Sequence, residues 1–418
     1  TLEATQSCPS TPGQDIKKPF HIPLAVGLLD RATGNDLPLQ FAGEGAPEAE
    51  SPTTRILDLR DATQTFRFEN LSAAPVPSLL RGFSAPVKLN FDLDDETLVF
   101  ALANDSDPFN RWEAGQKYAT RVILKGVAEL AAGRAPQCDQ TFVDALGKVL
   151  ADPGLDGELA AEILTLPGES FLGEQMAVID VQGIHDARRL VRRWIADGIK
   201  DLLIATYDST ANAGPYQTDG PSIARRRLRN ICLGYLMETG HQPHVDRCFQ
   251  QFQVSTNMTD VSAALQALAN VECPERAAAL AEFEGKWRDE PLVMDKWFAV
   301  QATSYLPGTL GRVRGLMDHA GFDLKNPNRV RSLIGAFCLS NPVHFHAADG
   351  SGYSFFGTQI LALDSLNPQV AARLMGEIIR WRRFDPQRQA LMKAELERIV
   401  GTDGLSRDVY ELAVKSLE

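Results

Sequence analysis

The stretch Asn326–Phe355 reads NPNRVRSLIGAFCLSNPVHFHAADGSGYSF and begins two helices with the same device. An asparagine precedes a proline at Asn326–Pro327 and at Asn341–Pro342, and a third copy follows at Asn367–Pro368. An asparagine side chain can cap the first backbone N–H groups of a helix, and proline already has a helical φ. An apolar stripe with helical spacing follows the first start: Val330, Leu333, Ile334 and Phe337. The stretch therefore predicts short helices in succession.

Two arginines, Arg329 and Arg331, lie in the first turns of the first of these helices. A cation there faces the positive end of the helix dipole, at a cost of about 0.3–1 kcal/mol when exposed. Either an acidic partner lies nearby, or the site receives an anion. Arg331 follows the first Asn–Pro start and Arg373 follows the third. If those starts face one concavity, Arg331 and Arg373 form an anion-receiving patch; the alternative is a surface salt bridge to an acidic neighbour.

Residues 1–103 are predicted to form an Ig-like β-sandwich domain, because short alternating segments are separated by frequent turn signals. Candidate strands include Phe20–Leu29, Thr65–Phe68, Asn90–Leu93 and Thr97–Leu102. Pro19 and Pro23 mark the first of these as an edge or bulged strand. The last two flank a run of three acidic residues, which is interpreted as a hairpin-like turn.

Residues 104–418 are predicted to form an α-helical C-terminal domain. The clearest helix is His185–Tyr207, with apolar residues on one face and four arginines crowded on the other. Successive helices with short connections, and no strict sequence period, favour a HEAT-like antiparallel array, which offers a concave face. The fold class is thus mainly α with an N-terminal all-β domain.

Composition narrows the functional classes. The 418-residue chain has a net charge of −12, which argues against general affinity for nucleic acid backbones. No apolar run reaches the roughly 18–20 residues that span a membrane. Six scattered cysteines without a CxxC favour reduced thiols and a cytoplasmic location. Residue 1 is threonine, which hints that the chain is a fragment.

A search for catalytic and metal motifs finds neither HExxH nor GxSxG. His241 and His244 with Cys248 form the best metal-like cluster, but a surface turn explains them better. His344 and His346 point about 200° apart on a helix and make a poor ligand pair. The glycine-rich run Gly350–Tyr353 is interpreted as a tight interhelical turn. We therefore predict no catalytic residue and no metal ligand in this chain.

Three arginine-rich clusters could bind RNA: Arg188–Arg193, Arg225–Arg229 and Arg380–Arg383. Because the chain is acidic overall, solvated and ion-paired helix faces are the favoured interpretation. Trp287, Trp297 and Phe298 are interpreted as core rather than as a binding box.

The sequence resembles the C-terminal half of the M1 family of zinc aminopeptidases. The resemblance covers nearly the whole chain and rests on eight segments: Pro19–Leu24, Pro75–Phe91, Asp107–Ala114, Glu158–Pro167, Asn257–Ala264, Leu292–Ser304, Asn326–Phe337 and Asp349–Tyr353. Family members have an N-terminal β domain, a catalytic domain with HExxH and GxMEN, a β-sandwich and a large helical domain. This chain looks like the last two parts.

The resemblance implies that zinc and the peptide chemistry belong to a catalytic domain missing here, so this chain alone should be inactive and bind no zinc. It implies that the helical domain caps the catalytic cleft and admits short peptides. Arg331 and Arg373 match family positions that reach the far end of a peptide, and its free carboxylate is the expected ligand. The implied partners are peptides and the catalytic domain, with no nucleic acid or membrane. The alternative is an independent HEAT-like scaffold for a protein or RNA partner.

Overall fold

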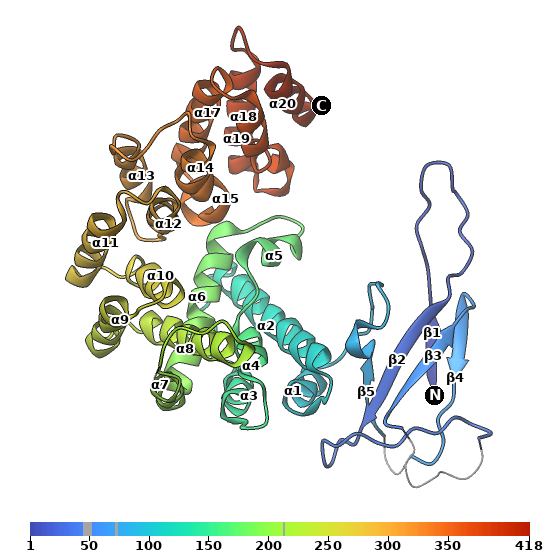
Figure 1. The fold of residues 1–418 in the computed structure, drawn as a ribbon. Coiled ribbons are helices and arrows are strands. Elements are labelled where there is room, and N and C mark those ends of the chain that lie inside the picture. Colours follow the sequence, from blue (N-terminus) through green and yellow to red (C-terminus); the bar gives the residue numbers. More distant parts are fainter. Residues whose placement is uncertain (45–51, 72–73, 212–213) are drawn as a thin grey trace. The chain divides into compact units, whose positions relative to one another are not determined.

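The computed structural model describes residues 1–44, 52–71, 74–211 and 214–418. They form two compact units: Thr1–Val122 with Asp139–Leu166, and Ile123–Cys138 with Pro167–Glu418. Strands occur only near the start of the described residues, and helices follow (Figure 1). The predicted fold class, a small β region before a helical array, is confirmed. The division into domains 1–103 and 104–418 stays a prediction.

The β region contains two antiparallel sheets. Their strands are β1 (Leu2–Thr5), β2 (Ile22–Leu29), β3 (Thr54–Leu59), β4 (Thr63–Phe66) and β5 (Val76–Leu79). One sheet pairs β1 with β4, and the other has the order β3–β2–β5. Every residue of β2 from Leu24 onward is buried, so this strand is the core of the region.

Strand β2 corrects the expectation of an edge or bulged strand, because it lies in the middle of its sheet. Strand β5 pairs only with Val26–Leu29, so Pro23 has a neighbour on the β3 side alone. A proline is tolerated there because its missing N–H removes no bond from a second ladder. Strand β4 covers part of the predicted Thr65–Phe68 strand.

The predicted strands Asn90–Leu93 and Thr97–Leu102 are wrong. The first has no regular structure, and the second belongs to the helix α1 (Asp95–Asn104). The supposed turn is the start of that helix, since the Asp94 side chain accepts a hydrogen bond from the backbone N–H of Thr97. A short apolar run fits either a strand or a helix, and here the cap decides.

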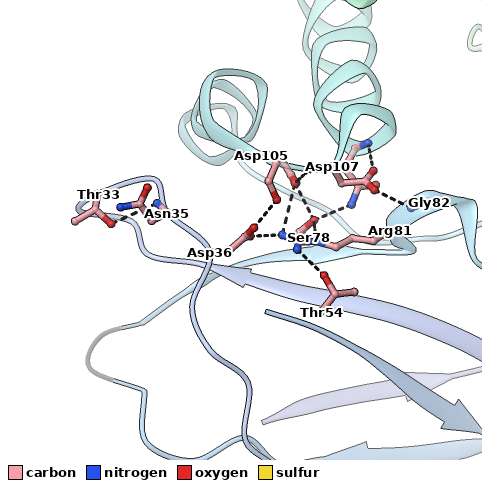
Figure 2. Close-up of polar contacts among 11 residues, drawn as sticks. Thr33, Asn35, Asp36, Thr54, Ser78, Arg81, Gly82, Asp105 and Asp107 are labelled. Carbon is pink, nitrogen blue, oxygen red and sulfur yellow. Dashed lines mark hydrogen bonds and ion pairs between the residues drawn. The ribbon is translucent and has the colours of Figure 1, made fainter. Parts of the chain in front are cut away.

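Arg81 lies at the centre of a buried polar cluster that we call the Arg81 cluster (Figure 2). Its guanidinium donates to Ser78 Oγ at 2.8 Å, Thr54 Oγ1 at 2.9 Å and Asp36 Oδ1 at 2.5 Å. The Ser78 hydroxyl donates to Asp105 Oδ1 at 3.0 Å, and Arg81 Nη2 lies 3.8 Å from the same oxygen. The cluster therefore ties β5 and the loop before β3 to the connection between α1 and α2.

The backbone around Arg81 is shaped to hold it. A Cβ atom at Gly27 of β2 would lie 1.9 Å from Arg81 Cζ, so the guanidinium occupies the space that a side chain would need. Leu80 has φ of 56° and Phe83 has φ of 52°, which non-glycine residues seldom adopt. The Gly82 N–H donates to Asp107 Oδ2 at 2.8 Å and fixes this turn.

The remaining elements are helical. In the first unit the helices after α1 are α2 (Pro108–Ala131, which continues into the second unit), α3 (Gln140–Ala151) and α4 (Gly157–Leu164). The second unit then contains α5 (Glu169–Glu174), α6 (Val181–Gly198), α7 (Lys200–Ser209), α8 (Gly220–Glu238), α9 (Gln242–Val254), α10 (Met258–Leu268), α11 (Pro274–Trp287), α12 (Pro291–Ala302) and α13 (Thr309–Met317). Its last helices are α14 (Pro327–Val330), α15 (Ala336–Ser340), α16 (Pro342–Phe345), α17 (Ser351–Asp364), α18 (Pro368–Leu374), α19 (Pro386–Val400) and α20 (Arg407–Leu417).

Successive helices from α7 to α13 pack on one another in chain order, as a helical array requires (Figure 1). The predicted helix His185–Tyr207 is two helices, α6 and α7, which meet at Ile199. Ile199 follows Gly198 and has φ of −121° and ψ of 28°, so the helical hydrogen-bond pattern is interrupted there. Among the described residues no helix is both long and apolar enough to cross a membrane.

Candidate anion-binding site

The stretch that begins at Asn326 forms a helical segment with a wide turn in its middle. Helix α14 runs into a π-helical turn, Arg331–Gly335, and then into α15. The apolar stripe predicted from the sequence, Val330, Leu333, Ile334 and Phe337, is fully buried. Burial of this stripe leaves Arg331 on the exposed side of the segment. Single π-turns within α-helices are frequent at functional sites.

Two of the three predicted asparagine caps are present. Asn326 Oδ1 accepts from the Asn328 N–H at 2.9 Å, and Asn367 Oδ1 accepts from the Val370 N–H at 3.2 Å. Asn341 is not a cap, because its buried side-chain amide donates to the carbonyls of Ala302 and Ser304 at 2.9 Å each. Since the asparagines take up free N–H groups, the helix starts themselves leave less room for an anion than the sequence suggested.

The two arginines of the first turn have different surroundings. Arg329 is 7% exposed and forms an ion pair with Asp295 of α12. It also donates to the carbonyls of Gly321 and Pro291 at 2.7 Å each. Arg329 therefore has the acidic partner that the sequence left open, and its role is structural.

Arg331 lies on a cavity of about 310 Å³ together with Arg373 of α18. We call it the arginine pocket; its other lining residues are Pro327, Leu339, Asn367, Gln369, Val370 and Leu374. The first and third Asn–Pro starts thus both line one cavity, as a shared anion-receiving patch of Arg331 and Arg373 requires. Arg373, however, lies in the last turn of the seven-residue α18, so the dipole of that helix start does not account for its position.

Neither arginine of the pocket has an acidic partner in the described part of the chain. Arg331 donates to the Pro327 carbonyl at 3.3 Å and to Asn328 Oδ1 at 3.1 Å, which are neutral acceptors. The Arg373 side chain makes no hydrogen bond or ion pair with any described residue. The predicted alternative, a surface salt bridge, is therefore absent within these residues. Two guanidinium groups on one cavity can receive a carboxylate or phosphate in bidentate geometry.

Two residues of the site were not predicted from the sequence. They are Asn328, whose side chain accepts a hydrogen bond from Arg331, and Leu339, an exposed apolar residue on the pocket wall. The position of Asn328 three residues before Arg331 was a readable signal, because residues three apart on a helix are neighbours. Nothing in the sequence indicated that Leu339 would be 42% exposed at the end of α15.

The histidines form no metal site among the described residues, where no group of three or more His, Cys, Asp or Glu side chains could hold a metal ion. His241 stacks on His244, while Cys248 is buried and donates to the Ala264 carbonyl. His344 Nε2 lies 3.0 Å from the Tyr305 carbonyl oxygen, and His346 Nδ1 lies 2.9 Å from the Tyr353 hydroxyl.

The arginine-rich clusters are largely engaged within the protein. Arg189 and Arg192 contact Glu238, Arg229 donates to the Tyr207 carbonyl, and Arg380 pairs with Glu174. These contacts agree with ion-paired faces. The three aromatic residues also follow the core interpretation in part, since Trp297 and Phe298 are buried and Trp287 is half-buried.

Two family models match this chain. A domain of unknown function described as ARM repeats (DUF3458_C) matches residues 95–418, and one described as an Ig-like fold (DUF3458) matches residues 1–92. The chain is 42% identical over 419 residues to aminopeptidase N of Escherichia coli (strain K12). It is 39% identical over 417 residues to aminopeptidase N of Haemophilus influenzae. Each match covers 100% of this chain and 47% of the relative.

A solved structure has the same fold. It is that of Legionella pneumophila aminopeptidase A in complex with aspartic acid, with a TM-score of 0.80 and 29% sequence identity. The match covers 95% of this chain and 45% of that chain. The chain therefore spans about half the length of the relatives that it matches, and it is homologous to them along its whole length.

Proposed function

Because this chain belongs to the family of DUF3458 domains, we propose that it is the non-catalytic C-terminal portion of a cytoplasmic, zinc-dependent M1 aminopeptidase. In this proposal the helical domain caps the active-site cleft, restricts access to short peptides and contacts the end of the peptide that is not cut. The homology to two aminopeptidases N supports this role. It does not favour the alternative of an independent scaffold for a protein or RNA partner.

The observation that carries the proposal is the arginine pocket. Arg331 and Arg373 share a cavity of about 310 Å³ and have no carboxylate partner among the described residues. A peptide that is cut at its amino end presents a free carboxylate at its other end. A charge-assisted hydrogen bond to such a group contributes about 1.5–3 kcal/mol, which is enough to fix the orientation of a short peptide.

The described residues of this chain do not fit a zinc ion, since they offer no cluster of metal ligands. In this proposal zinc and the hydrolytic step belong to a catalytic domain outside this chain. What the chain itself contributes is binding and orientation. The two guanidinium groups hold the carboxylate, and the pocket limits the length of peptide that reaches them.

The test is a binding measurement with the purified chain. A tripeptide with a free carboxylate and the same tripeptide with a C-terminal amide are titrated by calorimetry. We expect the free acid to bind about tenfold more tightly, a difference of about 1.4 kcal/mol. Equal affinity of the acid and the amide would overturn the proposal.

Two variants, Arg331→Ala and Arg373→Ala, should each remove most of that acid-over-amide preference. Arg407→Ala is the matched control, because Arg407 is an exposed arginine of the same unit outside the pocket. The chain should also give no hydrolysis of an aminoacyl reporter amide; chelator-sensitive turnover would contradict the assignment of catalysis to another domain.

A further inference from the structure

A second cavity of about 60 Å³ adjoins the arginine pocket. Leu339 lines both cavities, so they are neighbours at the end of α15. One water-sized group needs about 10–15 Å³, so the second cavity has room for a few such groups. Its apolar lining includes Pro342, Phe384 and Ile184.

The charged side chains of the second cavity are paired, with one exception. Glu169 lies 2.9 Å from His185 Nδ1, and Glu174 pairs with Arg380 and Arg383. The Glu377 side chain has no hydrogen bond or ion pair with any residue that the structure describes. It is half-buried, and burial raises the pKa of its carboxyl group.

A half-buried carboxyl group without a partner is costly unless it is neutral or meets a cation. An apolar lining with one carboxyl group matches the side chain of lysine or arginine, which has an aliphatic stem and a charged end. The neighbouring acids cannot take this role, since each is occupied by its own partner.

Glu377 lies four positions after Arg373, in the turn that follows α18. Met375 and Glu377 keep right-handed helical dihedral angles, so the two side chains are about one helical turn apart. Side chains at this spacing have Cβ atoms about 5–6 Å apart. One or two residues of an extended peptide cover that distance, at about 3.3 Å per residue.

We infer that these neighbouring cavities select peptides with a basic residue at the last or next-to-last position, with the terminal carboxylate on Arg331 and Arg373 and the side-chain cation on Glu377. The inference rests on the proposed function, because it takes the carboxylate receptor as given. It adds a substrate class: short peptides whose far end is basic.

Four tripeptides test it by calorimetric titration of the purified chain: Ala-Ala-Lys, Ala-Lys-Ala and the counterparts with norleucine in place of lysine. Norleucine keeps the aliphatic stem and lacks the ammonium group. We expect one of the lysine peptides to bind about tenfold more tightly than its norleucine counterpart. Glu377→Gln should reduce that preference to less than about twofold, while the preference for the acid over the amide persists.

Glu397→Gln is the matched control, because Glu397 is exposed and the net charge changes equally. Thermal unfolding of each variant verifies that it is folded. Lysine preference that is absent in the wild type, or that survives in Glu377→Gln, overturns the inference and leaves the proposed function intact. Loss of the acid-over-amide difference in the wild type overturns the proposed function itself.

Discussion

The Arg81 cluster and the arginine pocket both contain arginines, and they differ in what surrounds the charge. Arg81 is 7% exposed and lies among two carboxylates and two hydroxyl groups. Arg331 and Arg373 are exposed and have no carboxylate partner in the described residues. The N–H donors of Arg81 are bonded to groups of the protein itself, whereas the guanidinium groups of the pocket can bind an external anion. A buried arginine with a carboxylate partner therefore indicates a structural role, whereas an arginine on a cavity without such a partner indicates a ligand-binding site.

The largest expected effect is that of removing the buried charge of Arg81. Arg81→Met leaves Asp105, whose side chain is 2% exposed, without its cation. Burial already raises the pKa of Asp105. Removing one partner of a buried ion pair costs about 3–5 kcal/mol, so we expect a loss of this size in the free energy of unfolding. Urea denaturation measures it, and the exposed Arg60→Met is the control, with an expected change within about 0.5 kcal/mol. A loss below about 1 kcal/mol would mean that the cluster is not structural.

Arg329 and Arg331 give the same contrast within one helical turn, because Arg329 is paired with Asp295 and Arg331 has no carboxylate partner among the described residues. Arg329→Met breaks the ion pair with Asp295 and two bonds to carbonyl groups, and should cost roughly 3 kcal/mol of unfolding free energy. The loss should be at the lower end for a buried pair, because Asp295 is 18% exposed and keeps a bond from the Ser332 hydroxyl. The acid-over-amide preference of the pocket should persist in this variant. Loss of that preference, in a folded protein, would place Arg329 in the site.

His346 is a buried titratable group without an acidic partner among the described residues, and it should make the stability of the protein depend on pH. It is 4% exposed, stacks on Phe384 and contacts the Tyr353 hydroxyl, and burial lowers its pKa from 6.5 to about 3. Below pH 6.5 the unfolded chain takes up a proton that the folded protein refuses, so stability falls as the pH drops toward 3. The slope from this group is at most about 1.4 kcal/mol per pH unit.

The measurement is urea denaturation at several pH values between 7 and 4. His346→Asn should flatten the dependence, whatever its effect on stability at neutral pH. His241→Asn, which changes an exposed histidine at the start of α9, should leave the slope as in the wild type. An unchanged slope in His346→Asn would show that other groups carry the acid sensitivity.

The smallest expected change in stability is that of the two pocket arginines. Arg331→Ala and Arg373→Ala should change the free energy of unfolding by no more than about 0.5 kcal/mol, because neither side chain is buried or paired with a carboxylate among the described residues. Their effect belongs to peptide binding. A loss of about 2 kcal/mol in the free energy of unfolding of either variant would show that the arginine stabilises the fold.

The sequence predicted the local features of the site and not its long-range contacts. Asparagine caps at Asn326 and Asn367 and the buried stripe after Pro327 follow from spacing alone. The pairing of Arg329 with Asp295 joins residues 34 positions apart, and no periodicity reports it. The same holds for Asn341, whose side-chain amide donates to the carbonyls of Ala302, at the end of α12, and of Ser304, just after it.

The errors in the fold have a similar cause. The run Thr97–Leu102 contains residues that suit a strand, and the acidic run that begins at Asp94 suits a turn as well as a helix cap. The break at Ile199 lies inside an unbroken amphipathic pattern, so hydrophobic spacing could not locate it. Periodicity alone predicted a β domain followed by a helical array. The resemblance to a family of known architecture added the expectation of a separate catalytic domain and of a peptide ligand for Arg331 and Arg373.

The π-turn Arg331–Gly335 has a consequence for how the chain tolerates changes in length. The Ala336 N–H donates to the Arg331 carbonyl, five residues back, so this turn holds one residue more than an α-turn. Deleting one residue here would restore a regular α-helix without loss of backbone bonding, and would rotate the preceding residues by about 100° relative to α15. Arg331 would then leave the cavity while the apolar stripe was split between two faces. Across related sequences, a one-residue gap at these positions should therefore accompany replacement of the arginine, even where every other residue of the pocket is retained.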